Sequence, residues 1–198
     1  RERDGAYVPD RLLRASDLGN GEGENAEWKP VLIDGRSGEP VVPKGSVGHR
    51  YGKPGQWNLK LDGIEPLLTL IDGARERVPI DLPRFDVGEG EGGGSVRRGV
   101  PVRRIGGHLV TTVLDLSLAH YGVGREGLPG EWPADYEDPR PCTPAWQEEI
   151  TGVDGKLVAR VAREFARNAE VTEGRSMIAM GAGTNHWFHS DQVYRTFL

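Results

Sequence analysis

Glycine and proline interrupt this chain so often that few long helices or strands can form. The 198 residues include 29 glycines and 14 prolines, and these residues weaken or break regular elements. Only 36% of the residues are hydrophobic and the mean hydropathy is -0.52, which leaves little apolar surface for a self-sufficient core. Trp, Leu and Val nevertheless recur throughout and argue against wholesale disorder. We therefore expect a segment that packs against other segments rather than an independent domain.

The charge balance gives no sign of a nucleic-acid partner or an anionic membrane partner. The formal net charge is -5, so the chain has no global attraction to polyanions. Basic residues do gather locally at Arg97, Arg98, Arg103 and Arg104. We interpret them as a solvated loop edge beside a glycine run, because arginines are common on protein surfaces.

Cysteine usage excludes several kinds of site within the chain. Cys142 is the single cysteine of the sequence, so neither a disulfide within the chain nor a cysteine-rich metal site can form. An iron–sulfur cluster needs several thiolates and would have to be bound elsewhere. No stretch approaches the ~20 apolar residues of a membrane helix. The N-terminus has neither an initiating Met nor the apolar core of a signal peptide, and we expect both ends to be cuts within a longer protein.

The first half of the chain is predicted to be rich in β-hairpins and loops. Residues 1–87 carry short extended runs separated by Gly, Pro, Asp and Asn, such as Val31–Ile33 before the turn pair Asp34–Gly35. This punctuation is typical of irregular hairpins. A further apolar stretch between Gly63 and Leu82 is a candidate short strand.

A Gly- and Arg-rich linker is predicted over residues 88–105. Its glycine run, Gly88–Gly94, does not match a phosphate-binding loop, because two glutamates lie within it and no Lys-Ser or Lys-Thr pair follows. We therefore expect a flexible linker or a solvent loop.

An α/β segment is predicted over residues 106–198. Leu109–Val113 indicates a buried strand, followed by a helix that ends near Tyr121. Thr143 is a helix cap before a proline at the first helical position, and Asp154 is a cap for the next helix. Apolar residues follow at helical spacing, at Leu157, Val158, Val161, Phe165 and Ala169. Ser176–Met180 then predicts a short buried strand, so the order helix, strand and Gly-rich turn favours a Rossmann-like α/β arrangement.

One cluster of residues has the chemistry of a binding site, and it directly follows that last predicted strand. Ligands of open α/β sheets bind beyond the carboxyl ends of the strands. Two glycines allow close approach of backbone to a ligand and positive φ angles, and the three residues after the second glycine offer a hydroxyl, an amide and an imidazole that can bond a flat polar heterocycle or a phosphate. The candidate residues are Gly181, Gly183, Thr184, Asn185 and His186. The run lacks the third glycine of the dinucleotide fingerprint and no acidic residue follows at the required distance, which disfavours NAD binding.

His186 and His189 could also be considered as metal ligands. A zinc site needs a third and usually a fourth ligand, and the other histidines, His49, His108 and His120, lie far back in the sequence without ligand spacing. We expect no metal site made by this chain. The alternative is that both are ordinary core or loop histidines, with Asp191 as a candidate to orient one of them.

Several of these motifs together resemble a known family. Thr143–Trp146, Glu149–Val153 and Arg160–Ala166 resemble a stretch common to molybdopterin oxidoreductases related to dimethyl sulfoxide reductase. Gly174–Met177 and Gly181–His189 look like the catalytic (alpha) subunit of membrane-bound respiratory nitrate reductases. Further agreements lie upstream, at Leu13–Asp17, Glu27–Lys29, Val42–Pro43 with Gly45–Ser46, and Thr111–Val113 with Asp115–Leu116. The resemblance spans nearly the whole chain, and the Asn-His-Trp segment is its most specific part.

The resemblance implies more than the chain contains. Family members carry a bis-molybdopterin guanine dinucleotide, an aspartate that ligates molybdenum and a 4Fe-4S cluster. Their metal-ligand motifs lie upstream of the matching region, so this chain would be an internal, inactive piece of the subunit. The loop at Gly181–His186 would contact the pterin cofactor, with Asn185 the leading candidate, and no residue is implied to be catalytic or a metal ligand.

The implied activity is reduction of nitrate to nitrite by oxygen-atom transfer in anaerobic respiration. Electrons would arrive from quinol through an iron–sulfur beta subunit and a membrane cytochrome b subunit, which place the enzyme peripherally on the cytoplasmic side of the cell membrane. Alternatives are related enzymes that act on selenate, chlorate, dimethyl sulfide or ethylbenzene. A non-catalytic α/β binding module is an alternative of a different class, because the chain holds no complete catalytic set.

Overall fold

The computed structural model describes residues 1–19, 26–27, 29–44, 60–84 and 94–196. The chain divides into two compact units, Arg1–Trp146 and Gln147–Leu198, and each is described by itself. Among the described residues, all the strands belong to the first unit, and helices are the only regular elements of the second. None of the helices among the described residues is both long and apolar enough to cross a bilayer.

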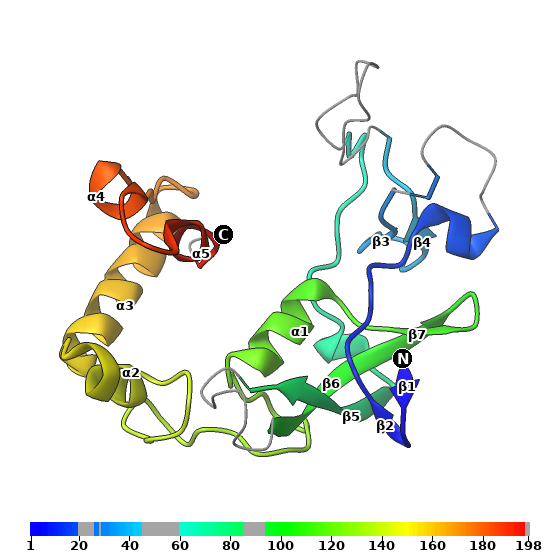
Figure 1. Ribbon diagram of the computed structural model, residues 1–198. Helices are drawn as coiled ribbons and strands as arrows, with labels where there is room; N and C mark the ends of the chain where they lie inside the picture. Colours follow the sequence, from blue (N-terminus) through cyan, green and yellow to red (C-terminus); the bar gives the residue numbers. More distant parts are fainter. Residues whose placement is uncertain (20–25, 28, 45–59, 85–93, 197–198) are drawn as a thin grey trace. The chain divides into compact units, whose positions relative to one another are not determined.

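A five-stranded mixed sheet organises the first unit (Figure 1), in the order β1-β2-β5-β6-β7. Its strands are β1 (Glu2–Arg3), β2 (Ala6–Tyr7), β5 (Glu76–Pro83), β6 (Ser95–Ile105) and β7 (His108–Val110). Neighbouring strands are antiparallel except for β2 and β5, which are parallel with Tyr7 opposite Ile80. The described residues of the first half therefore include several antiparallel strand pairs. The stretch from Gly63 to Leu82, predicted to hold a short strand, is only partly a strand, because β5 begins at Glu76 and Ile71 belongs to a 3-10 helix.

A separate short hairpin pairs β3 (Leu32–Ile33) with β4 (Pro40–Val41). Its turn contains the predicted turn residue Asp34, whose carboxylate accepts hydrogen bonds from the backbone N–H of Glu65 at 3.0 Å and from the hydroxyl of Ser37 at 2.8 Å. These bonds lower the pKa of Asp34 to about 2, because they stabilise the ionised carboxylate. The turn is thereby fixed to a segment that lies 31 residues further along the chain.

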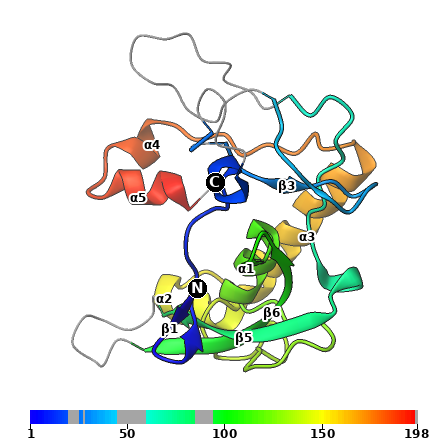
Figure 2. The same ribbon diagram turned by 90° about the vertical axis from the view of Figure 1, so that its right-hand side faces the viewer.

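The main core forms because β5 alternates between buried and exposed side chains. Val78, Ile80 and Leu82 all point to one face, as the two-residue period of a strand requires. Val100 and Val102 of β6 join them, together with Ala119 of a helix that lies over the pair (Figure 2). A smaller core joins Ile33, Leu70 and Ile105, near the 3-10 helices Ala15–Leu18 and Ile71–Gly73.

Residues 95–105, predicted to belong to a linker, form strand β6. They pair with β5 from Ser95 opposite Pro83 to Val102 opposite Glu76, so the backbone hydrogen bonds of the ladder decide the structure of this stretch. Arg98, predicted to be solvated, is only 4% exposed. Most of the glycine run, residues 88–93, lies outside the described residues.

Helix α1 (Val113–His120) follows a strand that is shorter than predicted, since β7 ends at Val110. Thr112 caps the helix by accepting a hydrogen bond from the N–H of Asp115. The Asp115 side chain is fully buried. Its carboxylate accepts bonds from the Thr69 hydroxyl at 2.6 Å, the Leu70 N–H at 2.8 Å, the Thr112 hydroxyl at 2.9 Å and Arg125 Nη1 at 2.6 Å. We call these contacts the Asp115 network.

Arg98 binds the opposite end of α1. Its Nη1 donates to the carbonyl oxygens of Ala119 and His120, each at 2.9 Å, and its Nε donates to the carbonyl oxygen of Glu131 at 2.9 Å. The guanidinium carbon also lies 5.6 Å from the centre of the Trp132 ring. A carboxylate in the first turn and a cation at the last carbonyls both match the polarity of the helix dipole.

The second unit contains α3 (Gly155–Val171), α4 (Ala182–Asn185) and α5 (Ser190–Arg195), and α2 (Pro144–Thr151) precedes them across the unit boundary. Both predicted caps are confirmed: the Thr143 hydroxyl accepts from the N–H of Trp146 at 3.1 Å, and the Asp154 carboxylate accepts from those of Lys156 and Leu157. Helix α3 ends at Val171.

The strand predicted at Ser176–Met180 does not form. These residues have no regular secondary structure, and four of the five are exposed. A strand requires a neighbour with which to exchange backbone hydrogen bonds, and the described residues of this unit supply none. The Rossmann-like arrangement predicted for the second half is therefore not formed by the described residues.

Replacing Gly99 by alanine tests the packing of β6. A Cβ at this position would lie 2.4 Å from Pro129 Cδ and 2.7 Å from the Pro129 carbonyl oxygen, so we expect a loss of about 3 kcal/mol in unfolding free energy. Thermal denaturation measures the change. Gly73→Ala is the control, since a Cβ there meets nothing within 4 Å. Equal midpoints for the two variants would contradict the close approach of Pro129 to β6.

Replacing Asp115 by alanine tests the Asp115 network. The substitution leaves the Leu70 N–H without its acceptor and leaves Arg125 Nη1 with the neutral Thr69 hydroxyl in place of a carboxylate. The loss of one member of a buried ion pair typically costs about 3–5 kcal/mol. Thermal denaturation should show a large drop, whereas the exposed neighbour Glu126→Ala should change little. A midpoint for Asp115→Ala within error of that control would refute the structural role.

Candidate functional site

The five predicted binding residues lie together around helix α4. Gly181 precedes the helix, Gly183, Thr184 and Asn185 are within it, and His186 follows it. Thr184 is half-buried and the other four are exposed. The turn closes through hydrogen bonds from the Thr184 N–H to the Gly181 carbonyl oxygen at 2.9 Å and from the His186 N–H to the Ala182 carbonyl oxygen at 3.3 Å. The hydroxyl, amide and imidazole are thus presented from one short turn.

The two glycines differ from the prediction in their backbone conformation. Gly181 is extended, with φ of -145°, and neither Gly181 nor Gly183 has a positive φ. The prediction of positive φ at these positions was wrong, and the positive value of this stretch falls on His189 at 59°. A Cβ added at either glycine would meet nothing within 4 Å. Gly181 and Gly183 therefore leave open space beside the backbone, and neither supplies a torsion angle that only glycine adopts readily.

Helix α3 anchors the beginning of this loop. The Ser176 hydroxyl donates to the Phe165 carbonyl oxygen at 2.9 Å and accepts from Asn168 Nδ2 at 2.9 Å. The N–H of Gly174, which has φ of 90°, donates to the Ala169 carbonyl oxygen at 2.6 Å. Polar contacts with α3 therefore fix the segment up to Ser176, and the candidate residues begin five positions later.

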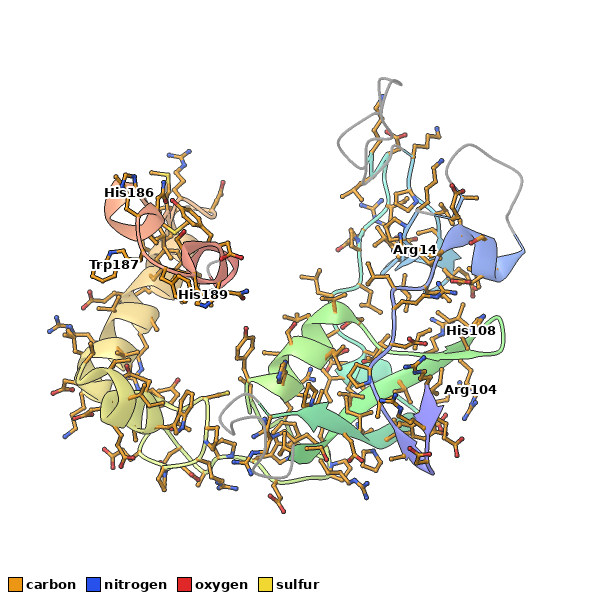
Figure 3. All side chains as sticks on the ribbon, viewed as in Figure 1. Arg14, Arg104, His108, His186, Trp187 and His189 are labelled. Carbon is orange, nitrogen blue, oxygen red and sulfur yellow. The ribbon has the colours of Figure 1, made fainter. Side chains whose placement is uncertain are left out.

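His186, Trp187 and His189 lie on the segment that joins α4 to α5 (Figure 3). The rings of Phe188 and His189 are 3.9 Å apart between centroids, at an interplanar angle of 54°. No hydrogen bond joins Asp191 to either histidine in the described part of the chain, so the suggested orienting role of Asp191 has no support. His49 lies outside the described residues.

No metal site is visible in the parts of the chain that the structure describes. These residues contain no group of three or more His, Cys, Asp or Glu side chains placed to hold an ion. The donor set at α4 consists of an amide, a hydroxyl and an imidazole, which bind by hydrogen bonds. This arrangement suits an organic ligand with polar edges.

Large apolar side chains surround the candidate residues and are strongly exposed. Met177 is 86% exposed, Trp187 73% and Phe188 89%. On α3, the predicted apolar stripe is also only partly covered, with Val161 54% and Phe165 42% exposed. Large apolar side chains that are exposed in such number are common at binding interfaces. The loop therefore has the properties of a surface that another group covers.

Neither of two surface cavities in the first unit includes the candidate residues. One cavity lies between the Leu67–Glu76 stretch and Val102–Arg104, and the other lies at the Pro83 and Ser95 ends of β5 and β6.

Asp115 and Arg98 were not identified from the sequence as buried charged residues. Thr112 three residues before Asp115 is a local capping signal, but nothing local to Arg98 indicates its burial.

Comparison with known proteins gives close relatives along the whole chain. No protein-family model matches it. The nitrate reductase alpha subunit of Mycobacterium tuberculosis (strain ATCC 25618 / H37Rv) is 51% identical over 205 residues, covering 100% of this chain and 16% of that protein. The respiratory nitrate reductase 2 alpha chain of Escherichia coli (strain K12) is 45% identical over 210 residues, covering 97% and 17%. The perchlorate reductase subunit alpha of Dechloromonas aromatica (strain RCB) is 43% identical over 188 residues, covering 93% and 16%. The chain thus spans only 16–17% of the length of these relatives.

Proposed function

Because the chain belongs to the family of nitrate reductase alpha subunits, we propose that it is a segment of an enzyme that reduces nitrate to nitrite in respiration. The observation that carries this proposal is 51% identity over the whole chain to one such subunit. The relatives described above are all subunits of reductases, which favours an enzyme over the non-catalytic binding module. The segment would be inactive alone, since it corresponds to 16% of the relative.

The proposed reaction removes one oxygen atom from nitrate. Two electrons and two protons complete the change to nitrite and water. A bis-molybdopterin guanine dinucleotide, the cofactor expected from the family, would supply the oxygen-atom transfer when bound. No residue of this chain is proposed to be catalytic, and the part assigned to it is to bind and orient.

We assign part of the cofactor binding to Gly181, Gly183, Thr184, Asn185 and His186. The open space at both glycines lets a ligand approach the backbone, and the exposed Asn185 and His186 side chains can donate to and accept from the edge of a pterin. The exposed rings of Trp187 and Phe188 provide an apolar surface beside these groups. These features fit the organic part of the cofactor. The described residues hold no cluster of metal ligands, so the metal would be ligated from another segment.

The proposed enzyme needs partners for electron supply. An iron–sulfur beta subunit and a membrane cytochrome b subunit would bring electrons from quinol, and would hold the complex at the cytoplasmic side of the cell membrane. A 4Fe-4S cluster of the alpha subunit would be bound outside this chain, since Cys142 is its single cysteine. The respiratory name of the Escherichia coli relative supports this arrangement.

A second candidate substrate is a chlorine oxoanion. The perchlorate reductase relative, at 43% identity, supports this candidate. An assay of the full-length enzyme with a reduced dye as electron donor separates the two, by comparing kcat/KM for nitrate, chlorate and perchlorate. We expect nitrate to give the highest kcat/KM, and a clear preference for perchlorate would overturn the nitrate assignment.

Asn185→Ala in the full-length enzyme tests the cofactor contact. Loss of one amide hydrogen bond should weaken cofactor binding by about 1–3 kcal/mol without preventing folding, because Asn185 is exposed. Molybdenum content per protein and the molybdenum reduction potential measure the effect. Gln192→Ala, which removes a second exposed amide nearby on α5, is the matched control. Unchanged content, potential and activity in Asn185→Ala would remove Asn185 from the site.

A further inference from the structure

A cavity of about 320 Å³ lies in the first unit, at the end of the β5–β6 pair where β5 stops and β6 begins. Four arginines line it: Arg84, Arg97, Arg98 and Arg140. Trp146, Pro83 and Val96 supply apolar wall. The volume is near the lower end of the range for small-molecule sites, so the cavity suits a small ligand.

Arginines outnumber carboxylates along the wall of this cavity. Glu131 is the one acidic residue among the described residues that line it. Arg97 pairs with Asp81 at 2.7 Å, and Arg140 Nε pairs with Asp138 at 2.9 Å, but neither aspartate is part of the lining. Asp81 and Asp138 therefore orient the guanidinium groups of Arg97 and Arg140 without being part of the lining.

Burial affects two of the lining groups. It lowers the pKa of Arg98, and among the neighbouring charges Cys142 raises this pKa more than Arg140 lowers it. Burial likewise lowers the pKa of His120, against a hydrogen bond with the backbone of Pro83 and with a further decrease from Arg98. Desolvation is therefore the main cause in both groups, and an anion in the cavity would offset it for the Arg98 cation.

We propose that this cavity binds a small oxoanion, either inorganic or the carboxylate of a small organic acid. Arginine is suited to this role because its planar fork of N–H donors matches the oxygen spacing of such anions. The buried Arg98 is held by three backbone carbonyl oxygens, so the position of this lining cation is fixed before any ligand arrives. The cavity shares no lining residue with the proposed cofactor loop, because all its lining residues belong to Arg1–Trp146.

Cys142 provides a local reporter, since it is exposed and also lines the cavity. The thiolate is the reactive form of cysteine, and nearby cations favour it. An anion in the cavity should slow alkylation by covering the sulfur and by raising the thiol pKa. The full-length protein is treated with a maleimide, and modification of the Cys142 peptide is followed by mass spectrometry with sodium phosphate, sodium acetate or sodium chloride at one ionic strength.

We expect phosphate to slow the alkylation of Cys142 in a saturable manner relative to chloride. Protection by acetate at lower concentration than phosphate would identify the carboxylate source, and the reverse order would identify an inorganic anion. Arg140→Gln and Arg84→Gln should each raise the half-protecting concentration about tenfold, the usual contribution of one charge-assisted hydrogen bond. Arg104→Gln, near the end of β6 (Figure 3) and not among the residues that line this cavity, should leave protection intact.

Three results would overturn the proposal. The first is alkylation at the same rate in phosphate, acetate and chloride. The second is equal protection in Arg140→Gln, Arg84→Gln and Arg104→Gln, which would indicate a general ionic effect. The third is a Cys142 that does not react at all in the native full-length protein, which would mean that the cavity is closed there.

Discussion

The buried charges at the two ends of α1 are the interactions on which the first unit depends. Asp115 accepts hydrogen bonds from a loop 45 residues earlier and from Arg125, ten residues later, and Arg98 joins β6 to the last carbonyls of the helix. Each charge is desolvated, and desolvation is unfavourable unless the group is fully bonded. Since these partners come from distant parts of the sequence, the helix, the sheet and the loops become ordered together. An eight-residue helix would be only marginally stable without such contacts.

The second unit is stabilised differently. Its longest helix, α3, is capped by the Asp154 side chain, but many apolar side chains of the unit are exposed, including Trp187 and Phe188. Local capping defines where the helices begin without burying their apolar faces. The conformation of the loop around α4, and the burial of its exposed apolar side chains, would then depend on what binds it. Exposed apolar side chains are expected in a segment of a large cofactor enzyme, because the cofactor and neighbouring segments would cover them in the complete enzyme.

The sequence predicted the features that depend on local chemistry. The caps at Thr143 and Asp154, the turn at Asp34 and the grouping of the five candidate residues are all decided within a few positions, and short motifs were sufficient to identify them. The family resemblance was likewise carried by contiguous motifs such as Gly181–His189. The relatives at 36–51% identity confirm it.

Features that depend on distant partners were missed. Arg98 belongs to a Gly- and Arg-rich stretch with the composition of a solvated linker, and only the register with β5 directs its side chain inward. Conversely, Ser176–Met180 has the apolar character of a buried strand but has no strand partner among the described residues. The Asp115 network joins residues 46 positions apart, and no periodicity in the sequence indicates that pairing.

Hydrogen–deuterium exchange on the full-length subunit, with and without the proposed molybdenum cofactor, tests the central claim most directly. Peptides from β6 should be protected in both forms, because the sheet and the contacts of α1 hold them without a ligand. Peptides over residues 177–189 should be protected only in the cofactor-loaded form. Equal exchange of residues 177–189 in the two forms, with a measurable response elsewhere in the subunit, would contradict the claim that this loop is ordered by the cofactor.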